Sequence, residues 1–239
     1  LFSGDAYVDH PSFGAAVIGR ILEAEGLRVA IVPQPNWRDD LRDFRKLGRP
    51  RLFFGISAGC MDSMVNKYTA NKRLRSDDAY TPDGRPDMRP EYPSIVYTQI
   101  LKKLYPDVPV VLGGIEASMR RLSHYDYWQD RLKKSILCES GADMLIYGMG
   151  EKPICELVRR LTALCDNQDG VISSSDIHSP ALSSIPQTAY LTRKYESDEN
   201  DITLYSHEEC LADKKKQATN FRHIEEESNK YAAARIVQA

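Results

Sequence analysis

Short apolar runs alternate with amphipathic stretches through the first 165 residues, and this alternation constrains the fold more than any other feature. The runs at 28–32, 52–56, 108–112 and 143–147 are typical of strands that are buried on both faces. The intervening stretches, such as 13–25 and 151–164, place apolar residues at helical spacing. Because strands that alternate with helices form parallel sheets covered on both faces, the sequence predicts a doubly wound, Rossmann-like α/β domain over residues 1–165.

The rest of the chain predicts a linker and a long helix. Residues 166–205 are rich in Ser, Asp, Asn and Pro, which is typical of a linker, here with short strands. Ser206 and Glu209 have capping-box spacing, so a charged helix is expected over 206–239. Its thin apolar stripe should pack on a neighbour beyond residue 239. Since the chain begins with Leu1 and ends without a helix stop signal, we expect a fragment of a longer protein.

Composition argues against several classes of partner. The formal net charge is -2, which does not favour nucleic acid. No apolar run is long enough to span a bilayer, and no signal segment opens the chain, so a cytoplasmic location without membrane contact is predicted. Five cysteines at wide spacings indicate reduced thiols, and neither a disulfide framework nor a metal site is expected.

Small and polar residues follow the predicted strands at their carboxyl ends, where open parallel sheets bind ligands. Glycines there let a ligand approach the backbone, although they also permit tight strand-to-helix turns. Glu116, Arg120 and His124 are expected to face such a crevice, where the cationic side chains of Arg120, Arg121 and His124 could hold an anion. The candidate cofactor-binding residues are Asp9, His10, Ser57, Gly59, Gly113, Gly114, Glu116, Arg120, His124, Gly148, Gly150 and Glu151, and no catalytic residue is assigned.

Known nucleotide and cobalamin motifs are incomplete. The Gly148-Met149-Gly150 turn lacks the third glycine of G-x-G-x-x-G and follows a late strand, which disfavours an NAD enzyme. Cobalamin proteins that ligate cobalt through histidine use D-x-H-x-x-G, but here Asp9 adjoins His10 directly. The fold leaves cobalamin open as a ligand, without His10 as the lower ligand.

Several longer stretches resemble one family. Six stretches are similar to the N-terminal region of the YgiQ family of radical SAM proteins. They are GDAYVDHPSFG at 4–14, MDSMVNKYTA at 61–70, DDAYTPD at 77–83, GGIEAS at 113–118, HYDYW at 124–128 and residues 206–230. The resemblance implies a cobalamin-binding-type α/β domain. It also implies that a C-x-x-x-C-x-x-C segment in the full-length parent binds a [4Fe–4S] cluster and S-adenosylmethionine. This chain has no such segment.

Three functions follow from the resemblance and the residues together. The first is a ligand-binding or substrate-presenting accessory domain, not catalytic alone, whose partner is the radical SAM domain of the same chain. The second is a docking module without a ligand, and the third is an independent nucleotide-dependent enzyme. A small-molecule ligand fits the first function, while substrate and reaction stay open.

Overall fold

The computed structural model describes residues 1–8, 14–167, 170–196 and 198–239. The chain divides into two compact units. The first comprises Leu1–Arg121 and Ile136–Leu191, and the second comprises Leu122–Ser135 and Thr192–Ala239.

A six-stranded sheet forms the centre of the first unit, and the predicted parallel sheet is confirmed. Its strands are β1 (Phe2–Ser3), β2 (Val32–Pro33), β3 (Phe54–Ser57), β4 (Val110–Gly113), β7 (Met144–Ile146) and β8 (Thr188–Ala189), in the order β2-β1-β3-β4-β7-β8. The first five are parallel and β8 is antiparallel to β7. This order reverses direction between β1 and β3, as in the flavodoxin-like variant of the doubly wound sheet, so the topological switch point lies there.

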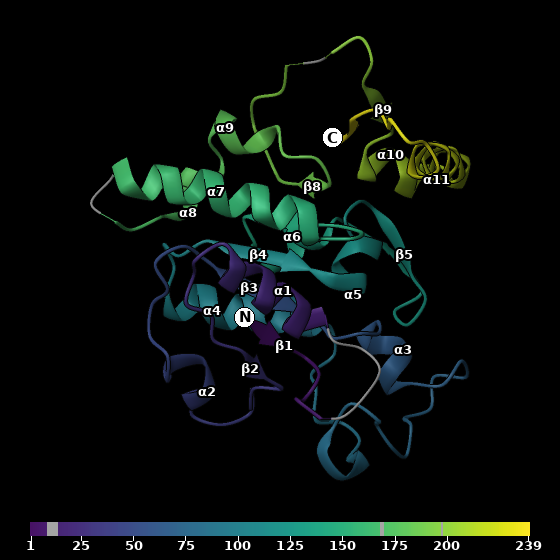
Figure 1. Ribbon diagram of the computed structural model, residues 1–239. Coiled ribbons are helices and arrows are strands. Elements are labelled where there is room, and N and C mark those ends of the chain that lie inside the picture. Colours follow the sequence, from purple (N-terminus) through teal and green to yellow (C-terminus); the bar gives the residue numbers. More distant parts are fainter. Residues whose placement is uncertain (9–13, 168–169, 197) are drawn as a thin grey trace. The chain divides into compact units, whose positions relative to one another are not determined.

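Helices cover both faces of this sheet (Figure 1). One face packs against α2 (Arg42–Arg45), α4 (Pro93–Leu104) and α6 (Ile136–Ser140), and the other against α1 (Gly14–Ala24), α7 (Glu151–Asn167), α8 (Ser174–Ile177) and α9 (Pro180–Ser183). Two short helices, α3 (Ser63–Lys67) and α5 (Gly114–Met119), follow β3 and β4, and a 3-10 turn spans Pro82–Gly84. No helix in the described ranges is long and apolar enough to cross a bilayer.

Aromatic side chains build the core on the face of α2 and α4. Phe2 stacks on Phe44 with ring centroids 5.3 Å apart, and Phe44 meets the ring of Tyr97 edge-on at 5.6 Å. All three are buried, together with Leu112 from β4. The opposite core is aliphatic and centres on Leu157 and Leu161 of α7. The amphipathic pattern of 151–164 therefore places its apolar stripe on the sheet, as helical spacing requires.

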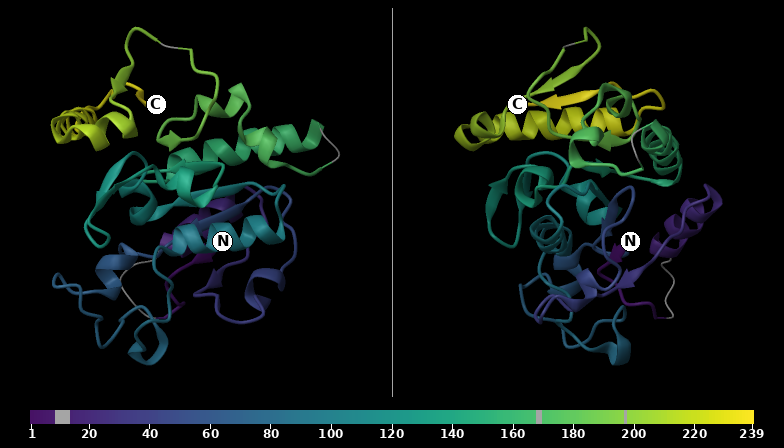
Figure 2. Two further views of the ribbon diagram at one scale, coloured as in Figure 1. Left: turned by 180° about the vertical axis from the view of Figure 1, so that it is seen from behind. Right: turned by 90° about the vertical axis from the view of Figure 1, so that its left-hand side faces the viewer.

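The second unit contains two small sheets and two helices. A hairpin pairs β5 (His124–Asp126) with β6 (Arg131–Lys133), and β9 (Ile202–Leu204) pairs in parallel with β10 (Ile236–Gln238). Between these last strands lie α10 (His207–Ala212) and α11 (Lys214–Ser228), seen from two sides in Figure 2. The predicted capping box at Ser206 and Glu209 is confirmed. The single helix expected over 206–239 is wrong in two places. It is interrupted at Asp213, whose extended backbone caps α11 through its side chain, and it ends at Ser228, after which residues 236–238 form β10.

Truncation of Leu112 tests the packing of the central strand. Leu112 is fully buried, so Leu112→Ala should lower the free energy of unfolding by about 2–5 kcal/mol through lost transfer energy and a residual cavity. Leu47 is 57% exposed, so Leu47→Ala should change it by less than about 0.5 kcal/mol. Urea unfolding measures both variants, and equal losses would contradict the assignment of β4 to the core.

Candidate functional site

The backbones after β1 and β3 approach each other closely at the switch point. Gly4 donates its N–H to the carbonyl oxygen of Ser57 at 2.9 Å, and a Cβ at Gly4 would lie 2.1 Å from the carbonyl oxygen of Ala58. Gly59 has φ +118°, and a Cβ there would lie 2.1 Å from a carboxylate oxygen of Asp5. Both positions therefore require glycine, because a side chain at either would displace the neighbouring strand end or Asp5.

A buried ion network occupies this switch point. The guanidinium of Arg89 donates to Asp5 at 2.6 Å, to Asp78 at 2.9 Å and to the carbonyl oxygen of Ala58 at 3.2 Å. Arg89, Asp5 and Asp78 are only 4%, 6% and 6% exposed. Asp5 also accepts the N–H of Cys60 at 2.7 Å. We call Asp5, Asp78 and Arg89 the switch-point network.

The switch-point network orders the long segment between α3 and α4. Asp78 and Arg89 both come from residues 68–92, whereas Asp5 follows β1. Asn66 of α3 donates to Asp78 at 2.9 Å, which extends the network to the start of the segment. Buried charges need partners, so the segment is tied to the sheet by its own ion pairs. The side chains of Asp5 and Arg89 thus occupy the place over β1 and β3 where related sheets bind ligands.

Tyr80 lies beside the switch-point network. Its hydroxyl group has a hydrogen bond with the thiol of Cys60. This bond, burial and the nearby charges of Cys60 and Asp5 together raise the pKa of Tyr80 to about 12. The positive charge of Arg89 has a smaller, opposing effect on this pKa. The guanidinium carbon of Arg89 lies 5.9 Å from the centre of its ring. Tyr80 therefore keeps its proton at neutral pH and covers one side of the arginine.

Glu116 joins the N-termini of two helices to α5. It is fully buried and accepts the N–H of Ser63 at 3.3 Å and that of Ser94 at 3.1 Å, and the hydroxyl of Ser63 also donates to it. Ser63 begins α3 and Ser94 lies in the first turn of α4. A carboxylate is favourable there, because the first turn of a helix leaves N–H groups without intrahelical partners. Glu116 thus holds two helix starts together.

Arg120, the residue after α5, contacts the start of α3. Its guanidinium pairs with Asp62, which also accepts the N–H groups of Met64 and Val65 at the start of α3. Burial alone would lower the pKa of Arg120, but the hydrogen bond with Asp62 and the charges of Asp62 and Glu116 outweigh it and raise that pKa. Both Glu116 and Arg120 are directed into the protein rather than toward an open crevice.

The ends of β4 and β7 have a different surface. Gly114 has φ +82° and passes close to the hydroxyl of Ser57, while the N–H of Gly148 donates to the hydroxyl of Ser118 at 3.2 Å. This hydrogen bond brings the turn before α7 against α5. Large apolar side chains of both elements remain exposed, namely Ile115 at 43%, Met119 at 58% and Met149 at 74%. We call these three residues the β4/β7 apolar surface.

The structure groups most of the sequence-predicted residues by strand end. Two of them end strands, Ser57 in β3 and Gly113 in β4. The others follow a strand: Gly59 follows β3, Gly114 and Glu116 follow β4, and Gly148, Gly150 and Glu151 follow β7. His124 belongs to the second unit, where its Nδ1 lies 3.0 Å from the carbonyl oxygen of Leu122. Asp9 and His10 lie outside the described residues. The assignment of these residues to cofactor binding stays a prediction.

Sequence reasoning missed the residues of the switch-point network. Asp5 lies two residues after β1, which ends at Ser3, so the strand-end rule would have selected it had the end of the first strand not been placed before Asp9. Asp78 and Arg89 had no such signal, because they lie in an irregular segment and are separated from Asp5 by many residues. Their pairing is visible only after the segment has folded back on the sheet.

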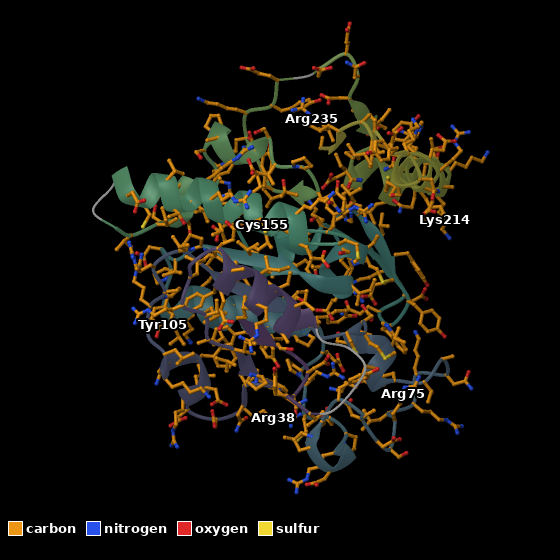
Figure 3. The ribbon with its side chains drawn as sticks, in the orientation of Figure 1. Arg38, Arg75, Tyr105, Cys155, Lys214 and Arg235 are labelled. Carbon is orange, nitrogen blue, oxygen red and sulfur yellow. The ribbon has the colours of Figure 1, made fainter. Side chains whose placement is uncertain are left out.

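The cysteines are not arranged for a metal cluster. All five carry reduced thiols, and they come from the turn after β3, from α6, from two positions on α7 and from α10. Figure 3 shows Cys155 on α7, whereas Cys60 follows β3. No group of three or more His, Cys, Asp or Glu side chains in the described part of the chain could hold a metal ion. These residues therefore do not fit an iron–sulfur cluster, which needs three or four convergent thiolates.

Comparison with known proteins decides the family. The family model described as "Radical SAM N-terminal" matches residues 1–239. The chain belongs to the Radical SAM N-terminal family. The resemblance to YgiQ proteins is thereby confirmed, because relatives of this Radical SAM N-terminal domain include the UPF0313 protein YgiQ of Escherichia coli, which is 58% identical over 161 residues.

Other relatives of this Radical SAM N-terminal domain match the whole chain. It is 79% identical to a UPF0313 protein of Bacteroides thetaiotaomicron and 70% identical to one of Porphyromonas gingivalis. It covers 38% and 36% of their lengths, and 22% of the Escherichia coli protein. The chain therefore spans little more than a third of the curated relatives that it matches in full. No solved structure matches it.

Removal of Arg89 tests the switch-point network. Arg89→Met leaves the buried Asp5 and Asp78 without their cation, so we expect the free energy of unfolding to fall by about 3–5 kcal/mol. Arg38, labelled in Figure 3, pairs with Asp87 while both side chains are more than 40% exposed, so Arg38→Met should cost about 0–1 kcal/mol. Urea unfolding compares the two, and a mild effect of Arg89→Met would show that the network is not formed.

The raised pKa of Tyr80 predicts a loss of stability in alkali. The pKa of an unfolded tyrosine is about 10, whereas the pKa of folded Tyr80 is about 12. Because the folded state then binds more protons than the unfolded state, stability contributed by Tyr80 falls as pH rises between these values. Unfolding at about pH 9 and about pH 11 should show a smaller alkaline loss in Tyr80→Phe than in the wild type. Tyr7→Phe, at a 71% exposed position, is the control and should leave the loss unchanged.

Proposed function

We propose that this chain is the N-terminal accessory domain of a cytoplasmic radical SAM enzyme and catalyses no step by itself. The observation that carries the proposal is the arrangement of its thiols, which lie on separate elements in a chain whose family is the Radical SAM N-terminal family. Five reduced cysteines also suit a reducing compartment, where disulfides are rare.

The remainder of the longer protein supplies the chemistry in this proposal. A [4Fe–4S] cluster with S-adenosylmethionine supplies one-electron reductive cleavage and a carbon radical. The relatives are long enough for this, because the chain accounts for only 38% and 36% of the two that it matches completely. The first unit then contributes a rigid α/β support, in which Glu116 and the switch-point network fix the helices and loops at the carboxyl ends of the strands.

The two halves of the carboxyl edge favour different roles. Over β1 and β3 the domain's own Asp5 and Arg89 occupy the usual ligand position, which favours support over ligand capture. Over β4 and β7 the β4/β7 apolar surface is exposed, and a Cβ placed on Gly113 would meet no other atom within 4 Å. A substrate, or the radical SAM domain itself, is therefore proposed to contact the β4/β7 half.

Cobalamin fits the described residues poorly. A corrin bound at the switch point would have to displace Arg89 from Asp5 and Asp78, leaving two buried carboxylates without a cation. The β1 and β3 ends are also already in close contact through Gly4 and Gly59. No role for cobalamin is therefore included in the proposed function.

Cysteine substitution in the full-length protein tests the proposal. Each of Cys60→Ala, Cys138→Ala, Cys155→Ala, Cys165→Ala and Cys210→Ala should keep the iron content of the wild-type protein after anaerobic reconstitution. The reason is that none of these thiols is placed to ligate a cluster. Iron per chain and cleavage of S-adenosylmethionine to 5′-deoxyadenosine are the two measurements.

The exposed Cys138 and the buried Cys165 form a matched pair for this experiment. Loss of iron in Cys165→Ala alone could come from unfolding, so circular dichroism of each variant is recorded alongside. A folded variant that loses its iron would place a cluster ligand in this chain and overturn the proposal. Wild-type protein that binds no iron would also overturn it.

A further inference from the structure

The strands β9 and β10 form a parallel pair with both outer edges open among the described residues. Ile236 lies opposite Ile202, and Gln238 lies opposite Leu204. The helices α10 and α11 make the connection between the two strands, as a parallel pair requires. In the right-hand view of Figure 2 the two arrows run in the same direction beside α11. Two strands alone form a sheet of marginal stability, and parallel sheets are normally larger and covered on both faces.

The hydrogen bonds of this pair show which groups of β10 face outward. The N–H of Ile202 donates to the carbonyl oxygen of Arg235 at 2.8 Å, so Arg235 directs its carbonyl toward β9. Successive residues of a strand point their backbone groups in opposite directions. Val237 therefore faces β9, as Arg235 does, whereas the N–H and C=O groups of Ile236 and Gln238 face the open edge.

Side chains at both ends of β10 hold this edge in place. Arg235 donates to Asp201 at 2.8 and 2.6 Å, which links the residue before β10 to the residue before β9. The side chain of Gln238 accepts the N–H of Ser123 at 2.9 Å and donates to the carbonyl oxygen of Tyr205 at 3.0 Å. The open edge is therefore already ordered, and a pairing strand would not have to order it.

The helix beside the pair also has an unpartnered apolar surface. The buried residues of α11 are the polar Asn220 and Glu227, while Phe221 is 61% exposed. Leu211 of α10 is 58% exposed. This distribution is the reverse of that expected for a helix that covers a complete sheet, and it indicates further protein on the outer side of the second unit.

We propose that a strand from the segment that follows residue 239 in the full-length protein pairs with the open edge of β10. This inference rests on the proposed function, in which the radical SAM part lies after this chain. The strand β10 ends at Gln238, so a short connection returns the chain to the same edge, and short loops have the smallest closure entropy. Strands that follow one another in the chain are also neighbours in a sheet in about two-thirds of cases.

The other edge of the pair is a less suitable site. Ile202 and Leu204 face β10, so Thr203 presents its backbone groups at the outer edge of β9. A chain leaving Gln238 would have to cross the face of both strands to reach Thr203. The β10 edge is therefore the one assigned to the pairing strand, and the second unit becomes the start of a larger sheet that continues into the radical SAM part.

Amide hydrogen exchange at single-residue resolution in the full-length protein tests this assignment. The outward amides of Ile236 and Gln238 should exchange within about tenfold of the rate of the inward amide of Val237, which is the control in the same strand. Exchange of Ile236 and Gln238 at the rate of exposed amides, with Val237 protected, would overturn the proposal. So would protection of Thr203 in their place, or protection that disappears on dilution, which would indicate a second copy.

A pair of substitutions separates edge pairing from simple packing. Ile236→Pro removes the outward donor, and Ile236→Val keeps it. At a free edge proline is tolerated, so Ile236→Pro and Ile236→Val should then give the same exchange rate at Gln238. At a paired edge the lost donor weakens the pairing, so the amide of Gln238 should exchange at least about tenfold faster in Ile236→Pro than in Ile236→Val. Equal rates in the two variants would overturn the assignment. Iron content is measured on the same samples, so failure of the edge pairing in iron-loaded protein is distinguishable from failure of the proposed function.

Discussion

The ion pairs of Arg89 with Asp5 and Asp78 are the interaction on which the carboxyl edge of the first unit's sheet depends. One guanidinium compensates two buried carboxylates, Asp5 after β1 and Asp78 within the segment 68–92. Through them the irregular segment 68–92 is fixed to the end of β1, where a sheet of this strand order would otherwise have an open crevice. The fold is thus of a ligand-binding type, but its own side chains occupy the position at the switch point.

This occupation separates the fold from the function usually associated with it. Doubly wound sheets have many unrelated functions, so strand order alone does not assign a ligand. In this domain the glycines after β1 and β3 permit the close approach of backbone and Asp5. Over β4 and β7, by contrast, Met119 and Met149 leave flexible apolar side chains exposed.

The two units differ in how complete they are as folded structures. The first has two cores, one on each face of its sheet, and both are closed by helices. The second has a parallel pair with outward backbone groups and an exposed Phe221 on its longest helix. The Bacteroides thetaiotaomicron relative is about 2.6 times as long as this chain, from a coverage of 38%, which leaves room for the strand proposed to pair with the second unit. Support by the first unit and continuation of the sheet from the second are consistent with one accessory domain attached to a catalytic part.

The sequence by itself determined the parallel α/β sheet, the amphipathic helices and the family, because these depend on local periodicity and on contiguous stretches. The apolar runs at 52–56 and 108–112 predicted β3 and β4, and the Ser206 to Glu209 spacing predicted the start of α10. The tertiary structure alone decided that Glu116 and Arg120, chosen as candidate ligand contacts, are buried against α3 and α4. It also decided that Arg89 pairs with Asp5 at the carboxyl ends of β1 and β3. Such pairings join residues far apart in the chain, so no local pattern encodes the partner of a buried charge. The partner depends instead on the path that an irregular segment takes over a completed sheet.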